Sequence, residues 1–297
     1  MFVQFFGGFL LNKGVVSKEQ LIDAMKKEST AHIQLGTLAM HASLMTAEQI
    51  EDIQIAQTHT DKRFGELCVD KGYLTEEQVN ELLASQYPKY LLLGQILEEQ
   101  GIFDQETFHA LVKEYISENS INEKDLPLED GETVAALVKD YCSDLLSSNK
   151  EYQIAYLQLL LNNLIRFIGG DFTLLRPVIR STSYPTQKFA AQKIIGSYPI
   201  TSILDMSEET AIQFASRYVS EEFICFDEYV RASMEDFLNL HNGLYNVNIS
   251  NSYSVELGLE PPISGERLAI AGGPHMYIFP ILFPFGVVNI VLSEMQE

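Results

Sequence analysis

Four glycines at a constant spacing constrain the fold of this chain more than any other feature of its sequence. Gly7, Gly36, Gly65 and Gly94 stand 29 residues apart. Self-similarity over such a period is typical of helical repeats, in which each unit buries its apolar side against a neighbour. We therefore expect an all-α domain of four repeats over residues 1–116, each made of a short helix, a tight turn and a longer helix.

The columns of residues around these glycines support a helix–turn–helix unit. A good N-cap residue follows each glycine after ten positions, and the first three caps have glutamine at the capping-box position. The caps are Ser17, Thr46, Thr75 and Asp104, and the glutamines are Gln20, Gln49 and Gln78. One fixed position of the longer helix is apolar in every unit: Leu21, Ile50, Val79 and Phe108. Gly14, Gly72 and Gly101 recur where the short helix should stop, and only Ser43 interrupts that column.

The repeat resembles the N-terminal domain of type II secretion and pilus assembly ATPases, the MshEN or GspE-N family. In some members a pair of such motifs binds cyclic di-GMP. The matching positions are Arg63, Gly65 and Gln86 in the third unit, and Gln34, Gly36 and Gln57 in the second. The resemblance implies that these residues bind cyclic di-GMP and that the first and fourth units are structural. The alternative is a purely structural helical module, because only the third unit keeps the cation that a phosphate-bearing ligand favours.

The length and charge of the chain narrow the classes of partner. With 297 residues the chain is long enough for two domains that each bury a core. Its net charge of -21 argues against nucleic acid or an anionic membrane as a broad surface partner, which leaves small molecules and proteins.

The cysteines and the apolar segments indicate the compartment. Cys68, Cys142 and Cys225 are scattered and form no CxxC pair, which fits a reducing cytoplasm and excludes a cysteine-built zinc site. The apolar run over residues 277–292 is interrupted by prolines and a glycine and is too short to span a bilayer. We expect a cytoplasmic protein with no membrane insertion and no metal site.

A polar, turn-rich segment at residues 117–131 indicates a domain boundary, so residues 117–150 are assigned to a linker and a connecting helix. Residues 151–297 alternate helical and strand patterns, which predicts an α+β domain with an extended, largely antiparallel sheet. Helices are expected over residues 156–168, from Ser207 onward, and over 226–240 with Gly243 as the stop. Strands are expected over 172–179, in a pair within 193–204, and over 246–257, 267–271 and 276–292.

One predicted helix of this domain carries a carboxylate and an amide side by side. Asp236 and Asn239 are three residues apart, so they share one face of the helix, while Phe237 and Leu238 turn toward the core. A rigid helix face of this kind can carry both groups into a site on another protein.

The second domain resembles the CheX, CheC and FliY family of chemotaxis phosphatases. The resemblance rests on the strand pair and helix start of residues 195–207, on Asp236 and Asn239 followed by Gly243, and on Pro262. Twenty-two residues separate Asn239 from Pro262, which is the family spacing. The resemblance implies binding of a phosphorylated response regulator, usually CheY, and hydrolysis of its phosphoaspartate.

The same resemblance assigns a role to each residue of the pair. Asn239 would orient the attacking water and Asp236 would pair with the regulator's lysine, while Pro262 completes the signature. The receiver domain of the regulator carries the Mg²⁺, so the chain needs no cofactor of its own. A homodimer built through the sheet is also implied.

Two departures from the family pattern leave other functions open. Asp236 stands where the family has the longer glutamate, and Ala232 stands where many members have aspartate or serine. A non-enzymatic adaptor with a degenerate CheX-like domain is one alternative. A scaffold of a type IV pilus or secretion system, suggested by the repeats alone, is another. His241 and His275 lack the spacing of metal ligands.

Overall fold

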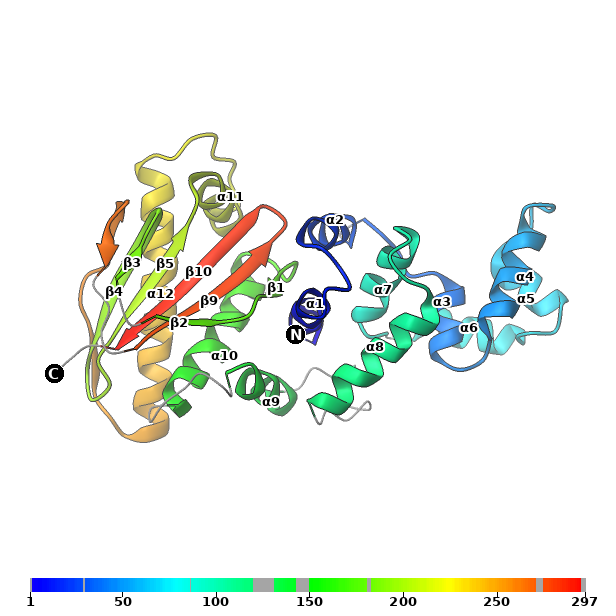
Figure 1. Ribbon diagram of the computed structural model, residues 1–297, viewed down its shortest axis with the longest axis horizontal. Coiled ribbons are helices and arrows are strands. Elements are labelled where there is room, and N and C mark those ends of the chain that lie inside the picture. Colours follow the sequence, from blue (N-terminus) through cyan, green and yellow to red (C-terminus); the bar gives the residue numbers. More distant parts are fainter. Residues whose placement is uncertain are drawn as a thin grey trace. The chain divides into compact units, whose positions relative to one another are not determined.

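The computed structural model describes residues 2–28, 30–85, 87–119, 131–142, 150–180, 183–270 and 275–294. The chain forms two compact units (Figure 1). The sheet unit consists of Met1–Lys13 and Asp130–Glu297, and the helical unit consists of Gly14–Glu129. Most of the assigned linker, residues 120–130 and 143–149, lies outside the described residues. Among the described residues, no helix combines the length and the apolar character needed to cross a membrane.

The helical unit alternates shorter and longer helices, in line with the repeat. Its helices are α2 (Lys18–Glu28), α3 (Leu35–His41), α4 (Ala47–Gln57), α5 (Phe64–Asp70), α6 (Glu76–Ala84), α7 (Tyr90–Glu99) and α8 (Gln105–Glu118). Thr46 and Thr75 form the predicted capping boxes at the starts of α4 and α6, and Asp104 caps α8 by accepting from the Thr107 N–H.

The glycine column allows the two helices of one repeat to pack closely. In the last three repeats a side chain at the glycine would press on the apolar residue fourteen positions later; the pairs are Gly36 with Ile50, Gly65 with Val79, and Gly94 with Phe108. A side chain at Gly36 would also meet Phe64, and one at Gly65 would meet Leu35. Because Leu35 and Phe64 are equivalent positions, the second and third repeats pack reciprocally around one shared core.

The short helices end on left-handed residues. Gly14, Gly72 and Gly101 have φ angles of 70°, 71° and 70°. Ser43, which interrupts this glycine column, adopts φ 57° at the same place in the second repeat. The backbone turn is therefore kept where glycine is lost, at the energetic cost that a Cβ brings to this conformation.

The first helix, α1 (Phe2–Asn12), packs in the sheet unit, although the sequence groups it with the first repeat. Almost all its residues are buried, and such a helix must be covered on more than one side. Gly7 lies against the Thr173 side chain and Gly8 against the Leu174 carbonyl, both in β1 (Thr173–Leu174). Gly7 and Gly8 therefore allow α1 to pack closely against β1.

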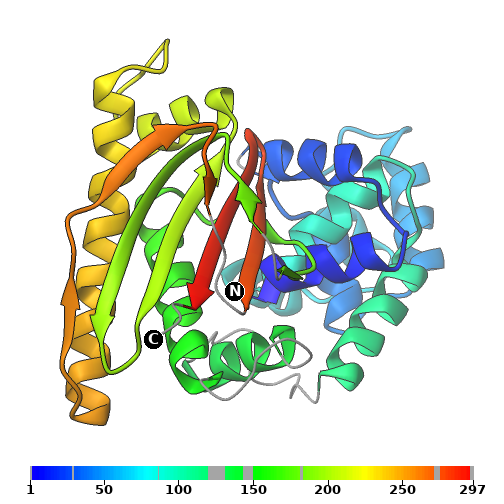
Figure 2. The same ribbon diagram turned by 60° about the vertical axis from the view of Figure 1, so that its left-hand side comes forward.

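The sheet unit is built on an eight-stranded sheet in the order β1-β9-β10-β5-β4-β6, with β2 beside β9 and β7 beside β4 (Figure 2). All its strand pairs are antiparallel. The strands after β1 are β2 (Val178–Arg180), β4 (Lys188–Gly196), β5 (Ile200–Met206), β6 (Leu257–Leu259), β7 (Ile263–Glu266), β9 (Met276–Phe283) and β10 (Gly286–Glu294). A small second sheet pairs β3 (Tyr184–Pro185) with β8 (Ala269–Ile270). The predicted α+β class with a largely antiparallel sheet is confirmed.

The helices of this unit are α9 (Gly131–Tyr141), α10 (Lys150–Phe167), α11 (Glu208–Val219) and α12 (Glu228–Tyr253). The long helix α12 lies along β4 and β5 and is flanked by α10 and α11 (Figures 1 and 2). It buries Val230, Met234, Phe237 and Leu238 completely. This packing fixes which face of α12 is left for solvent.

Two boundary predictions are wrong. Gly243 does not stop α12, which continues through most of the predicted strand 246–257 to Ser254, a left-handed residue. Tyr245 and Ile249 extend its buried stripe, and their burial outweighs the roughly 1 kcal/mol that a helical glycine costs. Residues 276–292 are likewise not one strand but the hairpin β9–β10.

Candidate functional site

The exposed face of α12 carries the predicted carboxylate and amide. Asp227 caps the helix by accepting from the N–H groups of Tyr229 and Val230, and the buried stripe then turns Asp236 and Asn239 to the opposite side. Both side chains are exposed, and so is Ala232 one turn before Asp236. The pair therefore stands on a rigid element, with the small side chain of Ala232 one turn away.

Asp236 is held from α11. The Tyr218 hydroxyl donates to Asp236 Oδ2 at 2.6 Å, and the Tyr218 ring packs edge-on against Phe237. Burial of the phenol, followed by its hydrogen bond with Asp236 and the negative charge there, raises the pKa of Tyr218. Tyr218 thus stays a proton donor, and the Asp236 carboxylate keeps one defined position.

Asn239 is held from the sheet. Gln192 Nε2, on β4, donates to Asn239 Oδ1 at 2.7 Å and to the backbone carbonyl of Glu260 at 2.9 Å. Gln192 Oε1 accepts from Asn242 Nδ2, also at 2.9 Å. Gln192 is only 2% exposed, so its hydrogen bonds are shielded from water.

Pro262 lies in the short connection between β6 and β7, at the edge of the sheet beside β4. It is half-buried. Gln192 links this connection to α12, because it bonds the Glu260 carbonyl and the Asn239 amide with the same nitrogen. Three predicted residues therefore fall on two adjoining elements: Asp236 and Asn239 on α12, and Pro262 on the neighbouring connection.

A groove of about 660 Å³ begins at Asp236 and runs between the end of α11 and the start of α12. Its lining combines the aromatic side chains of Tyr218, Phe223 and Tyr229 with acidic ones. Beside it the loop before α12 presents Ile224, which is 88% exposed. An apolar, acidic surface of this kind suits the basic and apolar side chains of a protein partner.

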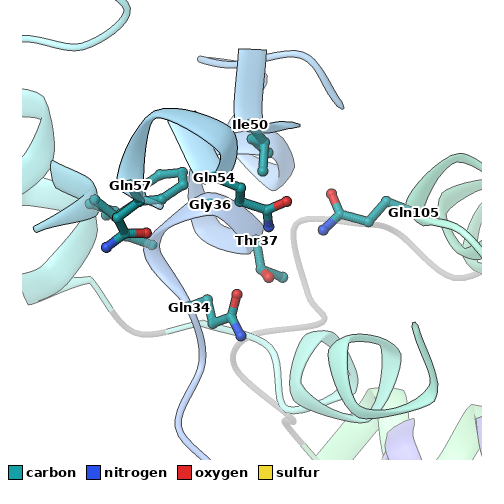
Figure 3. A pocket seen from close by; sticks show the side chains of 9 residues that line it. Gln34, Gly36, Thr37, Ile50, Gln54, Gln57 and Gln105 are labelled. Atoms are coloured by element: carbon teal, nitrogen blue, oxygen red, sulfur yellow. The ribbon is translucent and has the colours of Figure 1, made fainter. Parts of the chain in front are cut away.

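The helical unit has a cavity of about 400 Å³ that brings together Gln34, Gly36 and Gln57 (Figure 3). Thr37, Gln54 and Gln105 add polar groups that sequence comparison with the repeat family did not single out; the remaining lining residues are Leu35, Ile50 and Phe64. The carboxamides of Gln34, Gln54 and Gln105 turn toward the same space in Figure 3. Every residue that lines this cavity is uncharged.

The third-repeat candidates lie elsewhere. Gly65 lines a separate cavity of about 340 Å³ together with Glu66, Asp70 and Glu76, whose charges oppose an anion. Arg63 is the exposed N-cap residue of α5 and lines neither cavity. Gln86 lies outside the described residues. Gly65 and Arg63 therefore do not join Gln34, Gly36 and Gln57 in one cavity.

Two residues that hold the pair on α12 have no signal in the sequence. Gln192 is 47 positions from Asn239, and Tyr218 is 18 positions from Asp236. A polar residue within a strand, or a tyrosine on an amphipathic helix, does not reveal such a partner until the packing of α11, α12 and β4 is known.

No family model matches the chain, and no curated protein is similar to it. Among solved structures, a CheC-like superfamily protein from Shewanella sp. PV-4 is similar at 16% identity, with a TM-score of 0.44, over 49% of this chain and 98% of that one. A chain of the CheX–CheY–BeF3–Mg²⁺ complex from Borrelia burgdorferi is similar at 18% identity, with a TM-score of 0.42, over 49% of this chain and 98% of that one. FliY from Thermotoga maritima follows at 12% identity, with a TM-score of 0.37, over 50% and 92%. These chemotaxis proteins cover about half of the chain, and the resemblance of the repeats to MshEN stays a prediction.

Proposed function

We propose that the exposed face of α12 binds a phosphorylated receiver domain and promotes hydrolysis of its phosphoaspartate. The observation that carries this proposal is the pair itself. Asp236 and Asn239 are both exposed on one helix face, yet each accepts a hydrogen bond from a residue of another element. Side chains that are exposed and also fixed are what positioning chemistry in a partner's site requires.

In this reaction the chain only has to orient a water molecule and pair with a charge of the partner. Water attacks the phosphorus, the bond to the partner's aspartate breaks, and inorganic phosphate and a free carboxylate result. Asn239 orients the water without changing its own protonation, and Asp236 pairs with the partner's lysine. The receiver domain brings its own Mg²⁺, as the resemblance to the CheX family implies.

Small residues near the pair compensate for the shorter side chain of Asp236. Aspartate lacks one methylene relative to the family's glutamate, a difference in reach of about 1.5 Å. Ala232 is exposed on the same face, and nothing lies within 4 Å of the position that a Gly243 side chain would take. A partner can therefore approach α12 more closely here than over larger side chains.

Phosphate release from a phosphorylated receiver domain tests the proposal. The wild type should accelerate release, and Asn239→Ala should lower kcat on the order of a hundredfold, as expected when a group that positions water is lost. Asn248→Ala, another exposed asparagine of α12, is the matched control and should behave as the wild type. Saturable binding of the receiver without accelerated release would instead indicate the adaptor function.

A ligand site in the helical unit is the second candidate function. The 400 Å³ cavity that gathers Gln34, Gly36 and Gln57 supports it, and cyclic di-GMP is the ligand that the repeat resemblance implies. Titration with labelled cyclic di-GMP should show saturable binding that Gln57→Ala weakens. Arg63→Ala is the comparison, because Arg63 lines neither described cavity. Absence of saturable binding by the wild type would refute cyclic di-GMP as the ligand.

A further inference from the structure

Gln192 is a buried residue whose side chain donates a hydrogen bond to the Asn239 amide. It sits on β4 beneath α12 and makes three side-chain hydrogen bonds, to Asn239, Asn242 and the Glu260 carbonyl. Both hydrogens of its Nε2 are used, one for Asn239 and one for Glu260. A buried amide with this many partners has one stable orientation.

The backbone carbonyl of Glu260 determines that orientation. A carbonyl oxygen only accepts, so the Gln192 atom that faces it must be the Nε2 donor. The same nitrogen faces Asn239, so the Asn239 atom toward Gln192 must be the Oδ1 acceptor. Reversing either amide would set two acceptors or two donors against each other. The Nδ2 hydrogens of Asn239 are therefore directed away from Gln192.

We propose that Gln192 is a positioning residue that fixes the rotamer of Asn239 and turns its Nδ2 donors toward the partner's phosphoryl group. This inference rests on the proposed function of α12. The Nδ2 hydrogens donate to a phosphoryl oxygen, and the remaining lone pair of Oδ1 accepts from the attacking water, whose own lone pair stays directed at the phosphorus. Gln192 itself touches neither.

The inference also gives Pro262 a role. Glu260 donates its N–H to the Lys193 carbonyl and offers its own carbonyl to Gln192, so its position sets the whole chain of hydrogen bonds. Pro261 and Pro262 follow directly, and their fixed φ angles stiffen this connection between β6 and β7. In this arrangement Pro262 acts through Glu260 and Gln192.

The kinetic test replaces Gln192 by methionine, which keeps its length and removes its hydrogen bonds. Gln192→Met should lower kcat for phosphoryl release roughly tenfold, the loss that corresponds to one net hydrogen bond. The KM for the receiver should stay within about twofold, because the docking surface is unchanged. Gln213→Met, at an exposed position of α11, is the matched control. An unchanged kcat, or a change in KM alone, would overturn the inference.

A measurement on the wild type requires neither activity nor a folded variant. The order parameter of the Asn239 side-chain amide, measured by ¹⁵N relaxation, should approach the value of about 0.85 typical of rigid backbone. The side-chain amide of Asn248, which is exposed and accepts from the Ser252 hydroxyl at 3.5 Å, should fall below about 0.6. Equal mobility of the two amides refutes the positioning role. Rigid Asn239 in a protein that releases no phosphate supports the positioning role and refutes the proposed function.

Discussion

His241 should make the stability of the sheet unit depend on pH. Its side chain is fully buried in α12, with Nδ1 3.0 Å from Asn163 Nδ2 and the ring edge-on against Tyr156. Nε2 has no hydrogen-bond partner within the described part of the chain. Burial lowers the pKa of His241 from 6.5 to about 3, because the charged ring would lose its hydration.

Proton linkage determines whether the free energy of unfolding rises or falls with pH. Since the pKa is lower in the folded state, the unfolded chain binds more protons once the pH falls below about 6.5. The free energy of unfolding therefore decreases as the pH falls from about 6.5 toward 3. Between pH 7 and pH 5 the decrease amounts to about 2 kcal/mol for this one group.

Urea unfolding of the wild type and of His241→Gln at both pH values measures this term. Glutamine can still accept from Asn163 but does not titrate, so the variant should lose about 2 kcal/mol less than the wild type over this interval. His275→Gln, at an exposed position outside this buried cluster, serves as the comparison variant. Parallel losses in the wild type and His241→Gln would refute the reasoning.

Three further predictions concern backbone and site. Ser43→Gly should raise the stability of the helical unit by roughly 1 kcal/mol in thermal unfolding, because glycine takes φ 57° without a Cβ penalty; an unchanged midpoint contradicts this. Gly8→Ala should lower the stability by about 2 kcal/mol, because its Cβ would strike the Leu174 carbonyl, whereas Gly243→Ala should be neutral or stabilising in the same assay. Tyr218→Phe should fold normally and lower the rate of phosphate release, since the carboxylate it holds is freed; a wild-type rate would exclude that support.

The sequence predicts well those features that are encoded locally. The capping boxes at Thr46 and Thr75 connect residues three positions apart, and Gly72 follows the end of its short helix at the predicted position. A fixed spacing is enough to predict such features. The exposed face of α12 can be predicted for the same reason, because helical periodicity decides which side chains share one face.

Features that depend on packing between elements distant in sequence cannot be predicted in this way. Gly243 is a valid local stop signal, but the continued burial of Tyr245 and Ile249 keeps α12 helical beyond it. The support of Asn239 by Gln192 requires knowledge of which strand lies beneath α12. Periodicity in one segment contains no information about that neighbour.

The sheet unit is interrupted in sequence, since its first helix precedes the helical unit and its other elements follow it. During synthesis α1 emerges long before β1, so its apolar surface must wait for the whole helical unit to be translated. A fragment that begins at residue 151 would lack α1. Strand β1 would then be uncovered where Gly7 and Gly8 pack against it in the full chain. Such a fragment should aggregate. A soluble version of this unit should instead keep α1 and replace the helical unit by a flexible linker.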